Sequence, residues 1–497
     1  MVCSKEQRMK EGTLKKKVLA GLFWKALENG GVQLVQLIIS LILARILGPD
    51  RYGTISLLLV FIAIANVFIQ TGFQTSLIQK QKVDELDYSS VFFLSLGVAA
   101  ALYGIIFVGA PAVAAFYHDP VLSPMLRVLA LMIFFGAVVS VQTAIVSKKM
   151  EFRKMCIASL LATCLSGIAG VVGAWRGLET WALVVQQLSN QFLLMIFLWI
   201  LVGWRPRALF SLKRVESLFA YGWKLMFSSL IDTVYNNLYT MVIGKLYQKD
   251  IVGYYNRGNQ FPQLIVNNLA ASIQAVMLPA FAASQEDREK MKSMVRRSIV
   301  TSAFLVFPMM AGLIAVAKPM ITIVLTEAWL PCVPFLQIMC VAYAMWPIHV
   351  ANLQAINAMG RSDIYLKLEL VKKLLGLLVL AVSIPFGIYA MVWLKAATDF
   401  VGTIINAYPN KKLLGYSFAE QWKDVFPSLL LSVVMGLAVY SLQWVIQNNW
   451  LLLVTQVVAG VLIYGGLAWL FKLESFLYLL DTARGLLEKR SGKTGTR

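Results

Sequence analysis

The chain has 497 residues, of which 59% are hydrophobic and only 14% are charged. This apolar share is well above that of a soluble globular domain, so composition excludes a soluble enzyme or binding module. Lys and Arg outnumber Asp and Glu by 45 to 25, which gives a formal net charge of +20. In a chain this apolar, we expect the positive charge to mark one side of a membrane, and we expect no nucleic-acid partner.

Apolar runs of about twenty residues, long enough for a helix to cross a bilayer, recur along the whole chain. The runs do not alternate apolar with polar residues, so we exclude a transmembrane β-barrel. The basic start leads straight into a long apolar run, so we expect no cleaved signal peptide. The sequence predicts an all-α polytopic membrane protein with about fourteen transmembrane helices. The expected spans are 21–47, 51–78, 90–115, 124–146, 155–174, 179–203, 218–247, 251–281, 298–317, 332–357, 365–385, 388–408, 425–446 and 450–471.

Lys and Arg are concentrated in every second connection between the expected spans. The basic side includes Lys15, Lys16, Lys17, Lys148, Lys149, Arg205, Arg207, Arg296, Arg297, Lys411, Lys412, Lys489 and Arg490. The opposite side holds little beyond Arg51, Arg176, Lys249 and Lys318. By the positive-inside rule, this pattern predicts that both termini are cytoplasmic.

Matching segments 200 residues apart indicate an internal duplication. Residues 43–50 match 243–250, and Gly53 matches Gly253. Two halves of six spans each enter from the same side, so the repeat is parallel. The expected divisions are a basic cytoplasmic N-terminus (1–20), an N-terminal six-helix bundle (21–203), a cytoplasmic linker (204–217), a C-terminal six-helix bundle (218–408), an extra helix pair (425–471), and a cytoplasmic interfacial helix with a tail (472–497).

Two expected spans, 218–247 and 251–281, carry polar groups where a span is normally apolar. One helical face of the first span holds Lys224, Ser228, Asp232, Tyr235 and Tyr239. One face of the second span holds Arg257, Gln260, Asn267 and Gln274. An ionised Asp near the middle of a span costs about 3 kcal/mol unless it faces protein or water. These faces therefore predict a polar cavity inside a helix bundle.

The chain resembles bacterial polysaccharide flippases of the Wzx type, in the multidrug/oligosaccharidyl-lipid/polysaccharide exporter superfamily. The resemblance rests on the duplication with its extra helix pair and on the segments 43–53, 73–79 and 148–154. The exporters of capsule, colanic-type and teichuronic-type polymers are the most similar group. The resemblance implies a transporter, not an enzyme, in the bacterial cytoplasmic (inner) membrane. It would flip undecaprenyl-pyrophosphate-linked oligosaccharide from the inner to the outer leaflet by alternating access, for export of a cell-surface polysaccharide.

In this superfamily the first two helices of each half line the central cavity. The resemblance therefore adds the polar residues of the first two spans, namely Lys25, Glu28, Gln36, Asn66, Gln70 and Gln74. Amides, hydroxyls and tyrosine rings can bind sugars by hydrogen bonds and stacking. A pyrophosphate needs cations, and the planar fork of Arg257 suits its oxygens. Lys25 and Lys224 are the other cationic candidates, although lysines near span ends also snorkel to lipid headgroups.

Asp232 and Glu28 are candidates for coupling transport to H⁺, Na⁺ or the membrane potential, because carboxylates inside spans bind protons or cations. The alternative for Asp232 is a structural ion pair with Arg257 or Lys224. Lys395 and Asp399, four residues apart on one helix, are expected to pair with each other. No metal and no resident cofactor are expected.

The expected partners are the undecaprenyl-pyrophosphate-linked oligosaccharide and membrane lipids, with a polysaccharide polymerase complex as a further candidate. One chain encloses the cavity, so we expect a monomer. Two other functions stay open. One is an ion-coupled multidrug or cation antiporter of the same superfamily. The other is a polytopic polysaccharide polymerase or glycosyltransferase, which normally needs catalytic groups on a sizeable loop.

Overall fold

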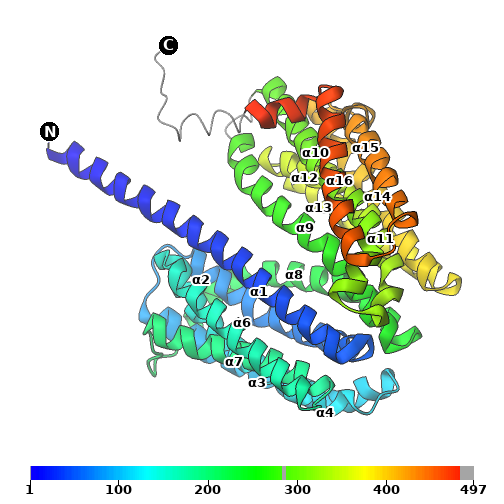
Figure 1. The fold of residues 1–497 in the computed structure, drawn as a ribbon. Helices are drawn as coiled ribbons and strands as arrows, with labels where there is room; N and C mark the ends of the chain where they lie inside the picture. The colour runs from blue at the N-terminus through cyan, green and yellow to red at the C-terminus, as the bar shows by residue number, and fades with distance from the viewer. Residues whose placement is uncertain (1, 283–286, 482–497) are drawn as a thin grey trace. The chain divides into compact units, whose positions relative to one another are not determined.

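The computed structural model describes residues 2–282 and 287–481, and in these ranges every regular element is helical (Figure 1). The predicted all-α fold is confirmed. The chain divides into two compact units, Met1–Gly253 and Tyr254–Arg497. The first unit contains α1 (Val2–Ile69), the π-helix η1 (Gln70–Gln74), α2 (Thr75–Gln79), α3 (Glu85–Phe116), α4 (Leu122–Leu129), α5 (Met132–Lys149), α6 (Phe152–Trp175), α7 (Thr180–Val202) and α8 (Leu212–Leu246).

Helix α9 (Lys249–Ala282) begins in the first unit and continues into the second. The rest of the second unit contains α10 (Arg288–Val324), η2 (Glu327–Cys332), α11 (Val333–Ala344), α12 (Trp346–Ala358), α13 (Ser362–Ser383), η3 (Ile384–Phe386), α14 (Ile388–Leu414), α15 (Phe418–Ser441), η4 (Leu442–Trp444) and α16 (Asn449–Leu470). A short helix over 474–481 follows, and the remainder of the expected C-terminal tail lies outside the described residues.

Within the described residues, ten helices are long and apolar enough to cross a membrane. One of them, Phe23–Gln79, covers the first two expected spans, because α1 continues through Gly48 and Pro49. Gly48 has φ +73°, which glycine adopts without strain, and the chain turns there as the sequence predicts. Polar and charged residues interrupt the apolar runs of α8, α9 and α13. The chain is thus a multi-pass membrane protein, while the count of fourteen spans stays a prediction.

The apolar core of the first unit joins α8 to helices that lie far before it in the chain. Val215 and Leu218 of α8 are buried in a cluster with Phe73, Leu77 and Val91. The two compact units divide after α8, at Gly253. The division into two six-helix bundles, which rests on the sequence repeat, stays a prediction.

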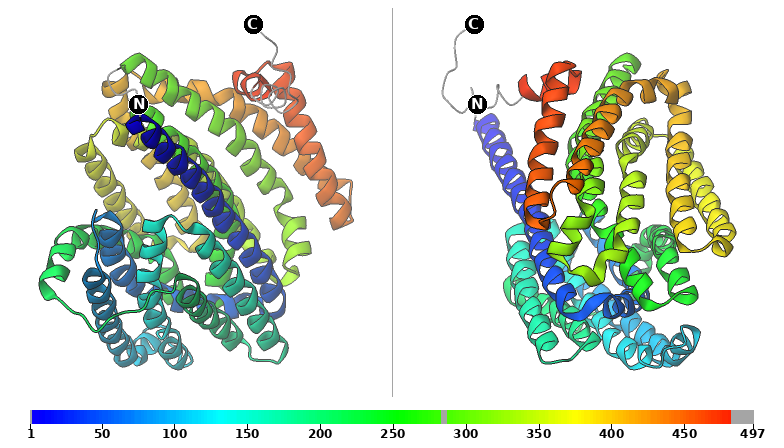
Figure 2. Two further views of the ribbon diagram at one scale, coloured as in Figure 1. Left: turned by 90° about the vertical axis from the view of Figure 1, so that its left-hand side faces the viewer. Right: turned by 45° about the vertical axis from the view of Figure 1, so that its right-hand side comes forward.

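In the second unit α15 and α16 pack against α10 (Figure 2). Their shared cluster includes Phe304, Leu431, Met435 and Tyr464, and the Tyr464 hydroxyl donates to the Phe304 carbonyl oxygen at 2.9 Å. This hydrogen bond satisfies a buried hydroxyl that would otherwise be costly inside a membrane. The extra helix pair is thus fixed to the second unit by both apolar and polar contacts.

Candidate functional site

Lys25 and Glu28 lie one turn apart on α1. The Nζ atom of Lys25 is 3.0 Å from Oε2 of Glu28, and Glu28 is buried. An ionised carboxylate within a span is costly unless it is paired, so Lys25 stabilises the charge of Glu28. Lys25 itself is half-buried. Farther along α1, Gln36 is exposed.

The predicted amide stripe of the second span coincides with an irregular stretch of helix. Gln70 and Gln74 are the two ends of the π-helix η1, a local widening that often occurs at functional sites. Asn66, one turn earlier, has a buried Oδ1 atom without a hydrogen-bond partner among the described residues. A Cβ on Gly136 of α5 would lie 3.2 Å from that oxygen and 4.0 Å from Nε2 of Gln70. The structure thus brings Asn66 and Gln70 together against one glycine.

The polar face of α8 varies in exposure along its length. Lys224 and Asp232 are exposed, Tyr235 is half-buried and Tyr239 is buried. Asp232 therefore lies on the exposed part of this face, whereas Tyr239 is packed among other side chains. The predicted stripe therefore consists of a charged segment followed by an aromatic one.

Arg257 is the residue with the most distinctive environment. It lies on α9 in the second unit and is only 3% exposed. Its Nη1 atom donates to Oε1 of Gln260 at 2.7 Å, and its guanidinium carbon lies 5.3 Å from the centre of the Trp329 ring. The hydroxyl of Tyr254 fixes the segment before Trp329 by donating to the Ala328 carbonyl oxygen at 3.1 Å. The cation is therefore oriented by an amide on one side and an aromatic ring on the other.

The structure describes the other predicted residues of the second unit to different extents. Asn267 is exposed, and the side chain of Gln274 lies outside the described residues. The expected pair of Lys395 and Asp399 is confirmed, with Nζ 2.8 Å from Oδ2. The structure therefore brings Arg257 and Gln260 into direct contact.

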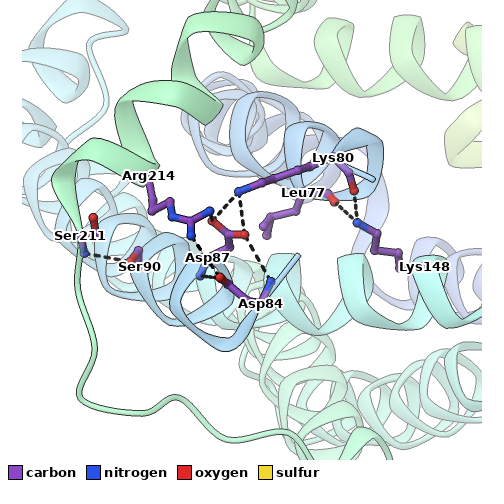
Figure 3. A network of polar contacts seen from close by, with 8 residues as sticks. All are labelled: Leu77, Lys80, Asp84, Asp87, Ser90, Lys148, Ser211 and Arg214. Atoms are coloured by element: carbon purple, nitrogen blue, oxygen red, sulfur yellow. Dashed lines mark hydrogen bonds and ion pairs between the residues drawn. The ribbon is translucent and has the colours of Figure 1, made fainter. Parts of the chain in front are cut away.

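Sequence analysis missed a charged cluster at the start of α3, which we call the α3 dock (Figure 3). It consists of Lys80, Asp84, Asp87, Ser90, Ser211 and Arg214. Asp84 caps α3 by accepting from the N–H of Asp87 at 2.9 Å. This hydrogen bond is the main reason why the pKa of Asp84 lies below its ordinary value, and Arg214 and Lys80 lower it further. The spacing Asp84 to Asp87 is a capping-box signal that the sequence offered.

Sequence analysis also missed a contact between the two repeat-related segments. A Cβ on Gly53 would lie 1.7 Å from the carbonyl oxygen of Lys249, and a Cβ on Gly253 would lie 2.2 Å from that of Pro49. Only glycine fits at both positions, because backbone carbonyls cannot move aside cheaply. Pro49 and Lys249 are themselves 200 residues apart, so the contact is reciprocal, as a duplication predicts.

These residues form a set suited to binding rather than to bond cleavage. Amides, tyrosines and a few cations can hold a hydroxyl-rich anionic group by hydrogen bonds and charge. Within the described residues, ten helices are long and apolar enough to cross a membrane, and they define a multi-pass membrane protein. The family model described as "Polysaccharide biosynthesis protein" matches residues 42–334. Because this match covers more than half of the chain, the chain belongs to that family.

Named relatives agree with the family. The chain is 24% identical over 450 residues to "Lipopolysaccharide biosynthesis protein WzxC" of Escherichia coli (strain K12), covering 86% of this chain and 89% of that protein. It is 23% identical over 485 residues to "Succinoglycan biosynthesis transport protein ExoT" of Rhizobium meliloti (strain 1021), covering 94% and 96%. The resemblance to Wzx-type polysaccharide exporters is confirmed.

A solved structure shares the fold. The chain superposes on "Lipid II flippase MurJ, inward closed conformation" with a TM-score of 0.75, covering 90% of this chain and 98% of that one. The two sequences are 14% identical, so this likeness concerns the fold alone.

Proposed function

We propose that the chain flips undecaprenyl-pyrophosphate-linked oligosaccharide repeat units from the inner to the outer leaflet of the bacterial cytoplasmic membrane. It does so by alternating access, with both termini in the cytoplasm. Family membership and relatives named for polysaccharide biosynthesis and transport support a lipid-linked polysaccharide cargo. The fold likeness to a lipid II flippase supports a lipid-linked substrate class.

The observation that carries the proposal is the environment of Arg257. Arg257 is a cation at 3% exposure within a membrane chain, and an ionisable group buried among spans is by default a candidate functional site. Its planar guanidinium matches two phosphate oxygens at once, and Trp329 and Gln260 hold its orientation. We assign the pyrophosphate to Arg257, with Lys25 and Lys224 as the cations that meet the headgroup first.

The sugar is assigned to neutral groups. Gln36, Asn66, Gln70 and Gln74 from α1 and η1 offer amide donors and acceptors without fixed charge. Tyr235 and Tyr239 add hydroxyls and apolar ring faces on which sugar rings stack. Gln260, Asn267 and Gln274 complete the proposed set. The hydrophilic headgroup crosses in this polar interior, while the polyprenyl tail remains in lipid.

Asp232 and Glu28 are the proposed coupling groups. Asp232 is exposed on the polar face of α8, and Glu28 is buried and paired with Lys25. We therefore expect Asp232→Asn to abolish ion-coupled transport while the protein still reaches the membrane. Glu28→Gln is expected to weaken the protein's stability more than its coupling. Normal transport by Asp232→Asn would remove this residue from the mechanism.

The test in cells is a leaflet-resolved measurement of the lipid-linked oligosaccharide pool after deletion of the gene. An impermeant reagent that modifies sugars distinguishes the outer leaflet from the inner one. The proposal expects accumulation of protected, inner-leaflet pyrophosphate-linked sugar, and the accumulated species identifies the cargo. An unchanged pool with build-up of toxic cations would favour an antiporter, and incomplete glycans would favour an enzyme.

A further inference from the structure

Helix α8 is the first span of the second repeat, yet its beginning is held by the first unit. In the α3 dock, Asp87 is fully buried and accepts from Nζ of Lys80 at 2.7 Å. Arg214 of α8 lies 3.3 Å from Asp84 and 3.7 Å from Asp87 (Figure 3). Because both carboxylates belong to the start of α3, Arg214 ties the first turn of α8 to that helix.

The linker before α8 is fixed to the same place through its backbone. The N–H of Arg207 donates to the hydroxyl of Ser89 at 3.1 Å, and the N–H of Ser211 donates to the hydroxyl of Ser90 at 3.0 Å. Both serines are buried on α3. Backbone donors next to a helix start usually need water or a cap, and here α3 supplies the acceptors instead.

The following turns of α8 approach the π-helix region closely. A Cβ on Gly222 would lie 2.3 Å from the carbonyl oxygen of Gly72, so the two backbones are in contact. The rings of Phe219 and Phe73 stack with their centres 5.7 Å apart. Close backbone approach at glycines is the usual way in which membrane helices pack tightly.

The other end of α8 is held as well. Nζ of Lys245 donates to the Phe116 carbonyl oxygen at 2.5 Å, at the end of α3. One turn later Lys249 lies 2.5 Å from the buried Asp119. The contact of Gly53 with the segment at Lys249 and Gly253 lies just beyond.

We propose that α8 moves as part of the first unit throughout the transport cycle, although the repeat assigns it to the second half. A rocking motion separates two bodies at one end while it keeps them together at the other. Contacts of α8 with the first unit at both its start and its end are therefore those of one body. This inference rests on the proposed transport function, since it concerns its cycle.

The proposal divides the charged residues of the proposed site between the two units. Lys224 and Asp232 travel with the first unit, whereas Arg257 belongs to the second. Alternating access then moves the proposed coupling carboxylate relative to the proposed pyrophosphate cation. If the boundary between the two moving bodies lay in the linker 204–217, Lys224, Asp232 and Arg257 would instead move together.

The second unit supplies a matched control, which we call the α10 dock. It consists of Lys292 and Arg296 at the start of α10 with Gly415, Glu420, Asp424 and Glu474. Arg296 lies 3.0 Å from Asp424 and 3.2 Å from Glu474, and Lys292 donates to the Gly415 carbonyl oxygen at 2.7 Å. This dock fixes α15, which carries no proposed site residue.

The first test locks α8 to α3. Ser90→Cys/Ser211→Cys joins two residues that already share a hydrogen bond, in a chain whose native cysteines are replaced. We expect the oxidised, cross-linked protein in proteoliposomes to flip a fluorescent lipid-linked oligosaccharide as fast as the reduced protein. Loss of flipping on oxidation, with recovery on reduction, would overturn the proposal, because it would show that α8 must leave α3.

The second test loosens the same contact. Asp84→Arg places a cation against Arg214, and we expect most of the flipping rate to be lost. Arg214→Gln in addition removes the repulsion between the two cations without placing a carboxylate against Asp87, and we expect part of the rate to return. Asp424→Arg in the α10 dock is the matched control, and we expect it to lower thermal stability without a comparable loss of flipping. Full flipping by Asp84→Arg would contradict the proposal.

A third readout does not depend on flipping. The thiol of Ser90→Cys should resist alkylation with and without substrate, whereas Gln260→Cys on α9 should change its reactivity when substrate is added. Substrate-dependent exposure of the Ser90→Cys thiol would overturn the proposal. A wild-type protein that flips no lipid-linked oligosaccharide would overturn the proposed function instead.

Discussion

The α3 dock and the α10 dock occupy equivalent places in the two predicted repeats but have opposite polarity. In each, the linker that follows the sixth expected span is fixed to the start of the third. In the α3 dock, a buried carboxylate, Asp87, receives cations from its surroundings. In the α10 dock, a half-exposed cation, Arg296, receives the carboxylates of Asp424 and Glu474.

The two docks fix different helices, so the same kind of connection serves two purposes. The α3 dock holds α8, which carries Lys224 and Asp232, whereas the α10 dock holds α15 of the extra pair. Removing a partner of the fully buried Asp87 is expected to destabilise the protein more than removing a partner of the half-exposed Arg296. The more sensitive contact is therefore found at the helix that carries proposed site residues.

The largest expected effect is on stability, and it comes from Gly222, where α8 contacts the backbone of Gly72. Gly222→Ala places a Cβ 2.3 Å from the Gly72 carbonyl oxygen, so one backbone must shift. Overpacking of this kind costs roughly 1–3 kcal/mol or more. Thermal unfolding in detergent should show a marked fall in Tm and weaker membrane expression.

The control for this change is Gly30→Ala on α1, where no atom lies within 4 Å of an added Cβ. Alanine is the better helix former, so Gly30→Ala should leave Tm unchanged or raise it. Equal Tm values for Gly222→Ala and Gly30→Ala would show that the backbone of α8 does not contact Gly72.

The second prediction compares the docks directly. Asp87→Asn removes a fully buried charge that accepts from Lys80 and faces Arg214, and it should cost about 2–3 kcal/mol. Glu474→Gln removes a partner of Arg296 whose side chain is 70% exposed, and it should cost less than about 1 kcal/mol. Chemical denaturation of the purified protein measures both. A larger effect at Glu474 would reverse the ranking of the two docks.

The smallest expected effect is on acid stability. The bidentate pair with Arg361 lowers the pKa of Asp363 to about 2. A carboxylate with a lowered pKa contributes stability that is complete above its ordinary value and is lost as the pH falls toward the folded value. Arg361→Gln should therefore reduce the fall in Tm between about pH 4 and pH 2.

Asp84 differs in its main cause, which is the N–H of Asp87 rather than a cation. Arg214→Gln should therefore leave most of the acid sensitivity contributed by Asp84 in place. If Arg214→Gln removed as much acid sensitivity as Arg361→Gln, charge would outweigh the helix cap in the α3 dock.

Much of the helix framework could be predicted from sequence. Apolar length placed helices at the expected spans, and Gly48-Pro49 marked the turn within α1, because glycine and proline restrict the backbone locally. The pair of Lys395 and Asp399 followed from helical spacing alone. Such features depend on neighbours within a few residues.

The contacts between distant segments could not be predicted in this way. Trp329 lies 72 positions after Arg257, and nothing local in its segment indicates that its ring faces a guanidinium. Arg214 reaches carboxylates that precede it by more than 120 residues. The attachment of α8 to the first unit depends on these distant partners, so the repeat alone suggested a different boundary.

The most direct test of the central claim is flipping of a fluorescent lipid-linked oligosaccharide by the purified chain in proteoliposomes, with outer-leaflet fluorescence removed by an impermeant quencher. The account predicts that the wild-type protein exposes protected substrate and that Arg257→Gln loses most of this activity while its Tm remains close to that of the wild type. Flipping by Arg257→Gln at the wild-type rate would contradict the assigned role of Arg257. No flipping by the folded wild-type protein would contradict the account as a whole.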